Sequence, residues 1–464
     1  MEVQVQRTTI ISHSDPTAVS SEVPLSVFDR FTSNIHIVVL FAFVPPIASN
    51  ESLIDGLKKT LAHFPTLTAQ LSYSHEHSRR PCLVIGGEGR GALLLEAAVA
   101  SNLLDHLPFE PSRHFGLLYP PTEEPEHLFQ VQLNRFKCGG LVIAMTAHHQ
   151  VADGQSMSTF FVAWGRAVRG LAIEKPPVFD RSLLKPRNPP KYEFPHRGFE
   201  FLPLCPNQDG LSLSERNINP SDIANIVLRY PLEYIAKLKA ELNRKYTTFE
   251  TLSAYLWRKI TIARGLAEQE YATIRISVNG RRRLQPPLPD EFVGNVVLMA
   301  HPGAKVKLLI EGGLSEAAQI VHKGIRKIDD HYFQSFIDFG VIHGDEELRP
   351  VYALEGNMLS PAVEVDSWLG FDFHKADFGG GGGRLCGFIP AWVPADGLVV
   401  FIPGLGEGGG VDVFVSLIEE HAKPLNAILA NSDSGILTKQ RLLAVLNRFK
   451  YNLRLILFYS DLMR

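Results

Sequence analysis

Apolar residues in the first 185 positions gather in short runs that are rich in β-branched and aromatic side chains, a pattern typical of strands. Between these runs, apolar residues recur three or four positions apart, as they do on one face of a helix. The pattern predicts strands at 35–43, 82–85, 129–133 and 141–147, and a helix at 52–63. We therefore expect this half of the chain to be mixed α/β.

The second half follows a proline-rich segment at 185–222 that has little apolar periodicity and that we interpret as a long crossover. Beyond it, the apolar spacing again alternates between helical and strand-like. The predicted helices are 231–243, 249–264 and 316–336, and the predicted strands are 272–278, 363–373 and 398–402.

A chain of 464 residues is too long for one compact core and predicts two domains with a cleft between them. We expect an N-terminal domain at 1–185, a crossover loop at 186–222 and a C-terminal domain at 223–431. Residues 432–464 form a tail in which basic residues interrupt an amphipathic, otherwise apolar pattern, and we interpret it as a surface helix.

The formal net charge of −3 gives no global field that would favour nucleic acid or an anionic membrane as a partner. The four cysteines are widely separated, which argues against a zinc site or a disulfide framework and suits a reducing compartment. No apolar run is long enough to span a bilayer, and the first residues do not resemble a signal peptide. We expect a cytoplasmic monomer without a metal ion.

The most informative motif is His148-His149-Gln-Val-Ala-Asp153-Gly154, directly after the apolar run at 141–147. Histidine titrates near neutral pH and is the commonest general base, and the aspartate could fix its orientation or bind a cation elsewhere. Adjacent histidines at a strand end point to opposite faces, so one of them at most faces a given cleft. A paired histidine is nevertheless more often structural than catalytic.

A second motif, Asp377-Phe378-Gly379, lies more than 220 residues after the first. In this order and spacing the two motifs resemble the BAHD family of plant CoA-dependent acyltransferases, which belongs to the superfamily of chloramphenicol acetyltransferase. Weaker similarities cover roughly residues 5 to 430 and include segments 24–29, 245–257, 278–283 and 294–295. The sequence as a whole is similar to grass amine hydroxycinnamoyltransferases.

The resemblance implies an α/β fold of two chloramphenicol-acetyltransferase-like domains, with mixed sheets flanked by helices and a channel between them. Acyl-CoA, a co-substrate and not a cofactor, would enter on one side and the acceptor on the other. His149 would be the general base, Asp153 would pair with Arg281 to hold the loop, and Asp377 would brace the channel wall. This chain departs from the family at Gly380, where the family has a tryptophan.

Further residues are assigned by the same likeness, each beside a simpler interpretation. The CoA-phosphate candidates Lys245, Thr247 and Thr248 could equally be the start of a helix with a threonine cap. Trp368 could donate its indole N–H to a developing oxyanion, whereas tryptophan is more commonly a core residue. His36 could line the acceptor channel or be a satisfied core histidine.

The acceptor is indicated by Glu355 and Asp366, which stand where family members that act on shikimate or quinate have an arginine and a threonine. Two acidic groups in a channel of low dielectric would repel a carboxylate and attract an ammonium group. We therefore expect an amine acceptor, such as putrescine, agmatine, tryptamine or tyramine, and an aromatic acyl donor. Asp366 could instead pair with a local cation.

Three alternatives stay open at the level of sequence. The first is an O-acyltransferase that acts on an alcohol such as shikimate or quinate. The second is a non-catalytic receptor with the same fold, against which the presence of both His149 and Asp153 argues. The third is a condensation domain of a peptide synthetase, against which the second motif and the lack of an adjoining carrier domain argue.

Overall fold

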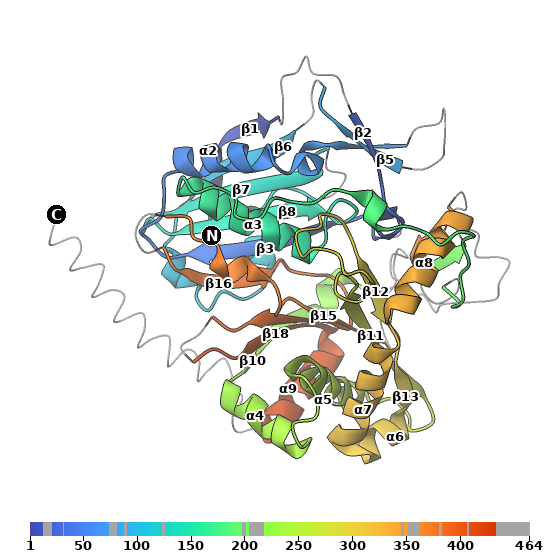
Figure 1. Cartoon of the computed structure of the whole chain (residues 1–464). Helices are drawn as coiled ribbons and strands as arrows, with labels where there is room; N and C mark the ends of the chain where they lie inside the picture. The colour runs from blue at the N-terminus through green and yellow to red at the C-terminus, as the bar shows by residue number, and fades with distance from the viewer. Residues whose placement is uncertain are drawn as a thin grey trace.

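Figure 1 shows the computed structural model of the chain, in which two sheets lie one above the other with helices packed against them. The described residues are 1–12, 21–30, 32–73, 81–87, 91–122, 126–196, 201–203, 218–344, 348–350, 362–379, 383–405 and 408–432.

The first sheet is mixed and six-stranded, because β6 and β7 are parallel and its other neighbours are antiparallel. In spatial order its strands are β1 (Val3–Ile11), β6 (Ala92–Val99), β7 (Phe129–Phe136), β8 (Leu141–His148), β3 (His36–Phe43) and β16 (Leu385–Pro390). Every residue of β8 is buried, because the core covers both of its faces, and the strand is therefore a continuous apolar run.

Helices α2 (Asn50–Leu61) and α3 (Gly154–Val168) pack against each other over one face of this sheet (Figure 1). Their apolar faces bury Leu53 and Leu57 of α2 and Phe161 of α3, whose ring stacks on Phe41 of β3 at 4.1 Å. Helix α3 begins at Gly154, the last residue of the histidine motif.

The second sheet is also mixed, since β15 is parallel to both of its neighbours. In spatial order its strands are β10 (Ile223–Tyr230), β18 (Val411–Ile418), β17 (Leu398–Pro403), β15 (Val363–Ser367), β11 (Tyr271–Asn279) and β12 (Val297–Ala300), with β13 (Gly303–Lys305) paired to β11. The helices packed with it around one apolar core include α4 (Leu232–Glu241), α5 (Thr248–Ala263), α6 (Val306–Glu311), α7 (Gly313–Arg326) and α9 (Glu419–Ser432).

Smaller elements complete the described chain. The remaining strands are β2 (Ser21–Pro24), β4 (Gln70–Tyr73) and β5 (Pro81–Ile85) in one sheet, and β9 (Phe201–Pro203) with β14 (Leu348–Pro350) in another. The remaining α-helices are α1 (Val27–Arg30) and α8 (Asp330–Ile342). Short 3-10 helices are η1 (Pro65–Thr68), η2 (Leu103–His106), η3 (Arg113–Leu118), η4 (Arg181–Leu183), η5 (Pro220–Asp222) and η7 (Asp372–Lys375).

The two halves of the sequence exchange elements across the proposed boundary. Strand β16 comes from the second half and forms an edge of the first sheet, where Phe388 pairs with Phe41. In the other direction, Phe28 of α1 packs on Phe336 of α8 at a ring distance of 5.1 Å. Each lobe therefore contains residues from both halves, a feature that the division at 185 and 222 does not capture.

Two predicted elements are wrong in extent. The single helix expected at 316–336 is two helices, because the chain turns at 327–329 and Asp329 caps α8 by accepting a hydrogen bond from the Tyr332 amide at 3.0 Å. The strand expected at 363–373 ends at Ser367 and is followed by η7. Over the described ranges, no helix is both long enough and apolar enough to cross a membrane.

Candidate active site

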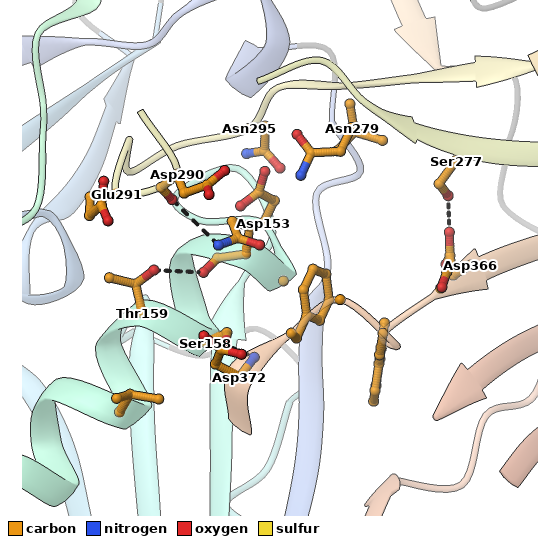
Figure 2. Close-up of a pocket in the computed structure, with 18 of the residues that line it drawn as sticks. Asp153, Ser158, Thr159, Ser277, Asn279, Asp290, Glu291, Asn295, Asp366 and Asp372 are labelled. Atoms are coloured by element: carbon orange, nitrogen blue, oxygen red, sulfur yellow. Dashed lines mark hydrogen bonds between the residues drawn. The ribbon is translucent and has the colours of Figure 1, made fainter. Parts of the chain in front are cut away.

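A cavity of about 1140 Å³ lies between the two lobes (Figure 2). The first half contributes His149 and the exposed face of α3, and the second half contributes residues of β11, β12 and β15. A volume of this order is large enough to hold a small-molecule ligand. Residues of both lobes therefore face one shared space.

His149 lies one residue beyond β8 and lines this cavity. Its backbone is held on both sides, because its N–H donates to the Ile35 carbonyl and its carbonyl accepts from Asn295 Nδ2, each at 2.8 Å. The ring atom Nδ1 is buried without a hydrogen-bond partner among the described residues. The His149 side chain therefore lines the cavity with its Nδ1 on the buried side of the ring.

His148 points the other way, as the alternation of side chains along a strand predicts. It is buried, its Nε2 lies 2.7 Å from Asn34 Oδ1, and its ring meets the edge of His36 at 4.9 Å. Burial, and then the neighbouring His36 and His149, lowers the pKa of His148 to about 4. His148 is therefore neutral at physiological pH and belongs to the packed interior.

Asp153 is the N-cap of α3 and pairs with Arg281, as the family resemblance implies. Arg281 donates from Nη1 and Nη2 to the two carboxylate oxygens at 2.6 and 3.0 Å, and the Ser156 amide donates to Oδ1 at 2.9 Å. Burial alone would raise the pKa of Asp153, but the guanidinium and the Ser156 hydrogen bonds hold it below its ordinary value. The carboxylate is thus directed at Arg281 and not at His149.

An acidic pair lies at the β15 side of the cavity. Glu364 and Asp366 are two residues apart on this strand and so share one face. Arg275 of β11 lies 2.8 Å from Glu364, whereas the Ser277 hydroxyl donates to Asp366 (Figure 2). Burial, and then the Glu364 carboxylate, raises the pKa of Asp366 to about 7, against which the Arg275 charge acts.

Of the other predicted residues, Trp368 also lines the cavity, and its ring stacks on Phe388 at 5.6 Å. His36 is not among the lining residues; it contacts His148 and lies 3.2 Å from the His127 carbonyl. Asp377 lies at the margin of the cavity and forms a half-exposed ion pair with Arg169 at 3.0 Å.

The CoA candidates lie at the start of α5, outside the lining of the cavity. The Thr247 hydroxyl caps this helix in a reciprocal pair with Glu250, and the Lys245 ammonium lies 5.5 Å from the Tyr246 ring centre. Thr248 is the first helical residue, and the next one, Phe249, does line the cavity. Glu355, Gly380 and residues 433–464 lie outside the described residues.

Comparison with known proteins identifies the group to which this architecture belongs. A model of the family described as the Transferase family matches residues 1–427. The chain belongs to this family, the BAHD acyltransferases. As a member of it, the protein is an acyl-CoA-dependent acyltransferase.

Curated relatives of this BAHD protein include three rice enzymes (Oryza sativa subsp. japonica). Tryptamine hydroxycinnamoyltransferase 2 is 37% identical over 93% of this chain and 99% of the relative. Agmatine hydroxycinnamoyltransferase 1 is 37% identical over 85% of this chain and 90% of the relative. Putrescine hydroxycinnamoyltransferase 3 is 38% identical over 86% and 91%.

Solved structures show the same fold. Vinorine synthase has a TM-score of 0.70 at 18% identity, with 93% of this chain and 98% of that chain covered. F. graminearum TRI101 complexed with ethyl coenzyme A has a TM-score of 0.68 at 14% identity, with 88% and 97% covered. The expected two-lobed α/β architecture is confirmed.

Sequence reasoning missed two features of this BAHD site. One is the Arg275–Glu364 pair beside Asp366, which the alternation Glu364-Val-Asp366 could have indicated, since residues two apart share a strand face. The other is the bond from Asn295 to the His149 carbonyl, which joins residues 146 positions apart. Local sequence contains no signal for such a contact.

Proposed function

We propose that the protein transfers an aromatic acyl group, of the hydroxycinnamoyl type, from its CoA thioester to a primary amine. The products are an amide and free CoA, and His149 is the general base. The observation that carries the proposal is the presence of His149 and the acidic Asp366 in the lining of one cavity. It is further supported by relatives whose names specify tryptamine, agmatine or putrescine as acceptor.

The proposed reaction proceeds without an acylated enzyme. The lone pair of the amine nitrogen attacks the thioester carbonyl carbon, and His149 Nε2 accepts a proton from that nitrogen. The tetrahedral intermediate then collapses, the C–S bond breaks, and the imidazolium returns its proton to the CoA thiolate. Holding both reacting atoms beside one imidazole lowers the entropic cost of the bimolecular step. Trp368 is the proposed oxyanion donor.

Preference for an amine rests on the charges of the cavity. Arg275 forms its ion pair with Glu364, and its charge also acts on Asp366, whose described hydrogen-bond donor is the neutral Ser277 hydroxyl. An ammonium or guanidinium group on the acceptor would neutralise this carboxylate. A carboxylate on the acceptor, as in shikimate, would be repelled by it.

The CoA end of the donor is proposed to lie toward the start of α5. Lys245 and the Thr248 hydroxyl would contact phosphate oxygens, whereas the Thr247 hydroxyl already serves as the helix cap. Acyl-CoA is consumed as a co-substrate, and the reaction as written requires no bound cofactor. We propose that the enzyme acts as a cytoplasmic monomer, a state that gel filtration of the purified protein would test.

The test is a product screen by mass spectrometry with p-coumaroyl-CoA and a panel of putrescine, agmatine, tryptamine, tyramine and shikimate. We expect amides from at least one amine, and loss of that product in His149→Ala. Formation of a shikimate ester in preference to every amide would favour the O-acyltransferase and end the amine proposal. If no acceptor releases CoA thiol, the protein is a receptor. An unchanged product in His149→Ala would remove this residue from its role.

A further inference from the structure

The segment 292–296 passes between two buried aspartates, each of which is paired with an arginine. On one side are Asp153 and Arg281, and on the other Asp29 of α1 and Arg181 of η4, whose Nη2 lies 3.3 Å from Asp29 Oδ2. The Phe292 ring contacts both guanidinium groups, at 5.0 Å from Arg181 and 5.9 Å from Arg281. The segment is therefore clamped from two directions.

Asp29 directs its other oxygen at Asn295. Its Oδ1 accepts hydrogen bonds from the Asn295 backbone N–H at 2.7 Å and from Asn295 Nδ2 at 3.1 Å. Asp29 is completely buried, and its Oδ2 also accepts a hydrogen bond from the Ser26 N–H at 3.0 Å. Asn295 is thus fixed at both its main chain and its side chain by one carboxylate.

The same Asn295 carboxamide donates from Nδ2 to the His149 carbonyl at 2.8 Å. This bond matters because the His149 imidazole has no described side-chain partner that could orient it. In the absence of such a partner, the placement of Nε2 depends on where the His149 peptide is held. A shift of Asn295 would be transmitted to the imidazole through that peptide.

We propose that Asp29 and Arg181 are positioning residues that hold the catalytic His149 in place through Asn295. The proposal rests on the proposed role of His149. It gives a function to segment 24–29, which the reaction itself does not use. It also joins the two lobes, since Asp29 and His149 belong to the first half of the chain and Asn295 to the second.

Gly294 shows how closely Arg181 approaches the clamped segment. Its φ of +136° lies in the region that favours glycine, and a Cβ at this position would lie 2.6 Å from Arg181 Nη2. Arg181 also donates to the Val293 carbonyl. The Arg181 guanidinium therefore packs directly against the backbone at position 294, where only glycine leaves enough room.

The experiment compares Asp29→Asn with a matched control in the same full-length enzyme. Asp338→Asn is the control, because Asp338 is equally buried and accepts a hydrogen bond from Arg187 at 2.5 Å, yet its described partners do not include Asn295. We expect Asp29→Asn to lower kcat about 10- to 100-fold with little change in KM for acyl-CoA, as a misplaced base would. Asp338→Asn should lower the melting temperature and leave kcat unchanged.

A double-mutant cycle with Asn295→Ala tests the route of the effect. If Asp29 acts through Asn295, the loss of kcat from Asp29→Asn disappears in the Asn295→Ala background. Equal losses of kcat in both backgrounds, or equal losses in Asp29→Asn and Asp338→Asn, would overturn the positioning role. Where Asp29→Asn does not fold, Ser26→Ala is the gentler variant, because it removes the hydroxyl that accepts the Asp29 backbone N–H at 3.1 Å and so loosens the placement of Asp29. The same outcomes apply to it.

His149→Ala separates this inference from the proposed function. If His149→Ala is inactive and Asp29→Asn is fully active, the positioning role alone fails. If His149→Ala remains active, the role of His149 fails first, and the positioning role fails with it. Arg181→Lys keeps the positive charge beside Asp29 and is expected to retain more activity than Arg181→Met, a difference that would be absent if Arg181 only filled space.

Discussion

Arg281 donates two hydrogen bonds to Asp153, and the exposed fraction of either side chain is below 5%. The aspartate of the histidine motif therefore does not form a catalytic dyad with His149. It fixes the start of α3 and the segment 292–296, because Arg281 also donates to the Phe292 and Gly294 carbonyls. The motif therefore joins the proposed base to a structural residue that lies four positions later.

Replacing Asp153 with Ala should destabilise the fold by about 3–5 kcal/mol, since the Arg281 guanidinium would stay buried without its carboxylate. Asp153→Asn retains an oxygen acceptor and the helix cap, and so should lose less. Urea unfolding followed by intrinsic fluorescence measures both free energies of unfolding. Equal midpoints for Asp153→Ala and the wild type would show that the pair is not a stability determinant.

Asp366 should destabilise the fold increasingly as the pH rises. Its pKa of about 7 in the folded chain lies above the ordinary 3.8, so its contribution to stability is present below about pH 4 and is lost as the pH rises through 7. Asp366→Asn does not titrate. The variant should therefore gain stability relative to the wild type between about pH 5 and pH 8. Melting temperatures across this range measure the gain, and a constant difference would contradict it.

Binding of a cation in the cavity should become stronger as the pH rises, whereas the stability of the fold decreases. Ionised Asp366 attracts a positive charge, so the inhibition constant of tetramethylammonium should fall by about 10-fold between roughly pH 6 and pH 8. A quaternary ammonium is suitable because its own charge does not titrate and it cannot be acylated. In Asp366→Asn the inhibition constant should be independent of pH. Competitive inhibition assays at fixed acyl-CoA concentration provide the measurement.

His148 should contribute to loss of stability in acid. Burial lowers its pKa to about 4 from an ordinary 6.5, so its neutral form stabilises the fold above pH 6.5, and this contribution is lost as the pH falls through 4. The difference in pKa corresponds to about 3 kcal/mol. His148→Gln should therefore have a smaller decline in melting temperature over this range. Parallel declines in variant and wild type would assign the acid sensitivity to other groups.

Gly165 of α3 should be intolerant of a side chain, because a Cβ there would lie 2.9 Å from the Asp377 carbonyl oxygen. Gly165→Ala should cost about 1–3 kcal/mol by displacing the turn at 377–379. Gly116→Ala is a matched control, since its nearest contact, the Tyr119 hydroxyl oxygen, would be 3.9 Å away. Thermal unfolding of both variants tests whether close packing of this turn on α3 stabilises it. Equal melting temperatures would contradict this.

The sequence predicted elements well where one physical signal dominated. Strand β8 and helix α5 were evident from their apolar patterns, and their observed limits differ from the expected ones by one residue at each affected end. The helix at 316–336 was wrong because apolar spacing continues across 327–329, although Asp329 is a good N-cap. The continuous apolar spacing concealed the helix boundary that Asp329 marks.

How well the sequence predicted the site depended on how far apart the contacting residues lie along the chain. Alternation in β8 indicated that His148 and His149 face different ways, and the structure places them so. The contact of Asp29 with Asn295 spans 266 positions and depends on how the lobes meet. Such contacts leave no signal in the local sequence, so they can be identified only from the arrangement of the two sheets.

Strand β16 imposes an order on the biosynthesis of this protein. It completes the first sheet by pairing with β3, yet residues 385–390 leave the ribosome long after the other strands of that sheet. Until then, the nascent N-terminal half presents the β3 edge with its main-chain groups unpaired and with Phe41 and Phe43 uncovered on that side, which is a surface prone to aggregation. The first sheet can therefore be completed only after residues 385–390 have been translated.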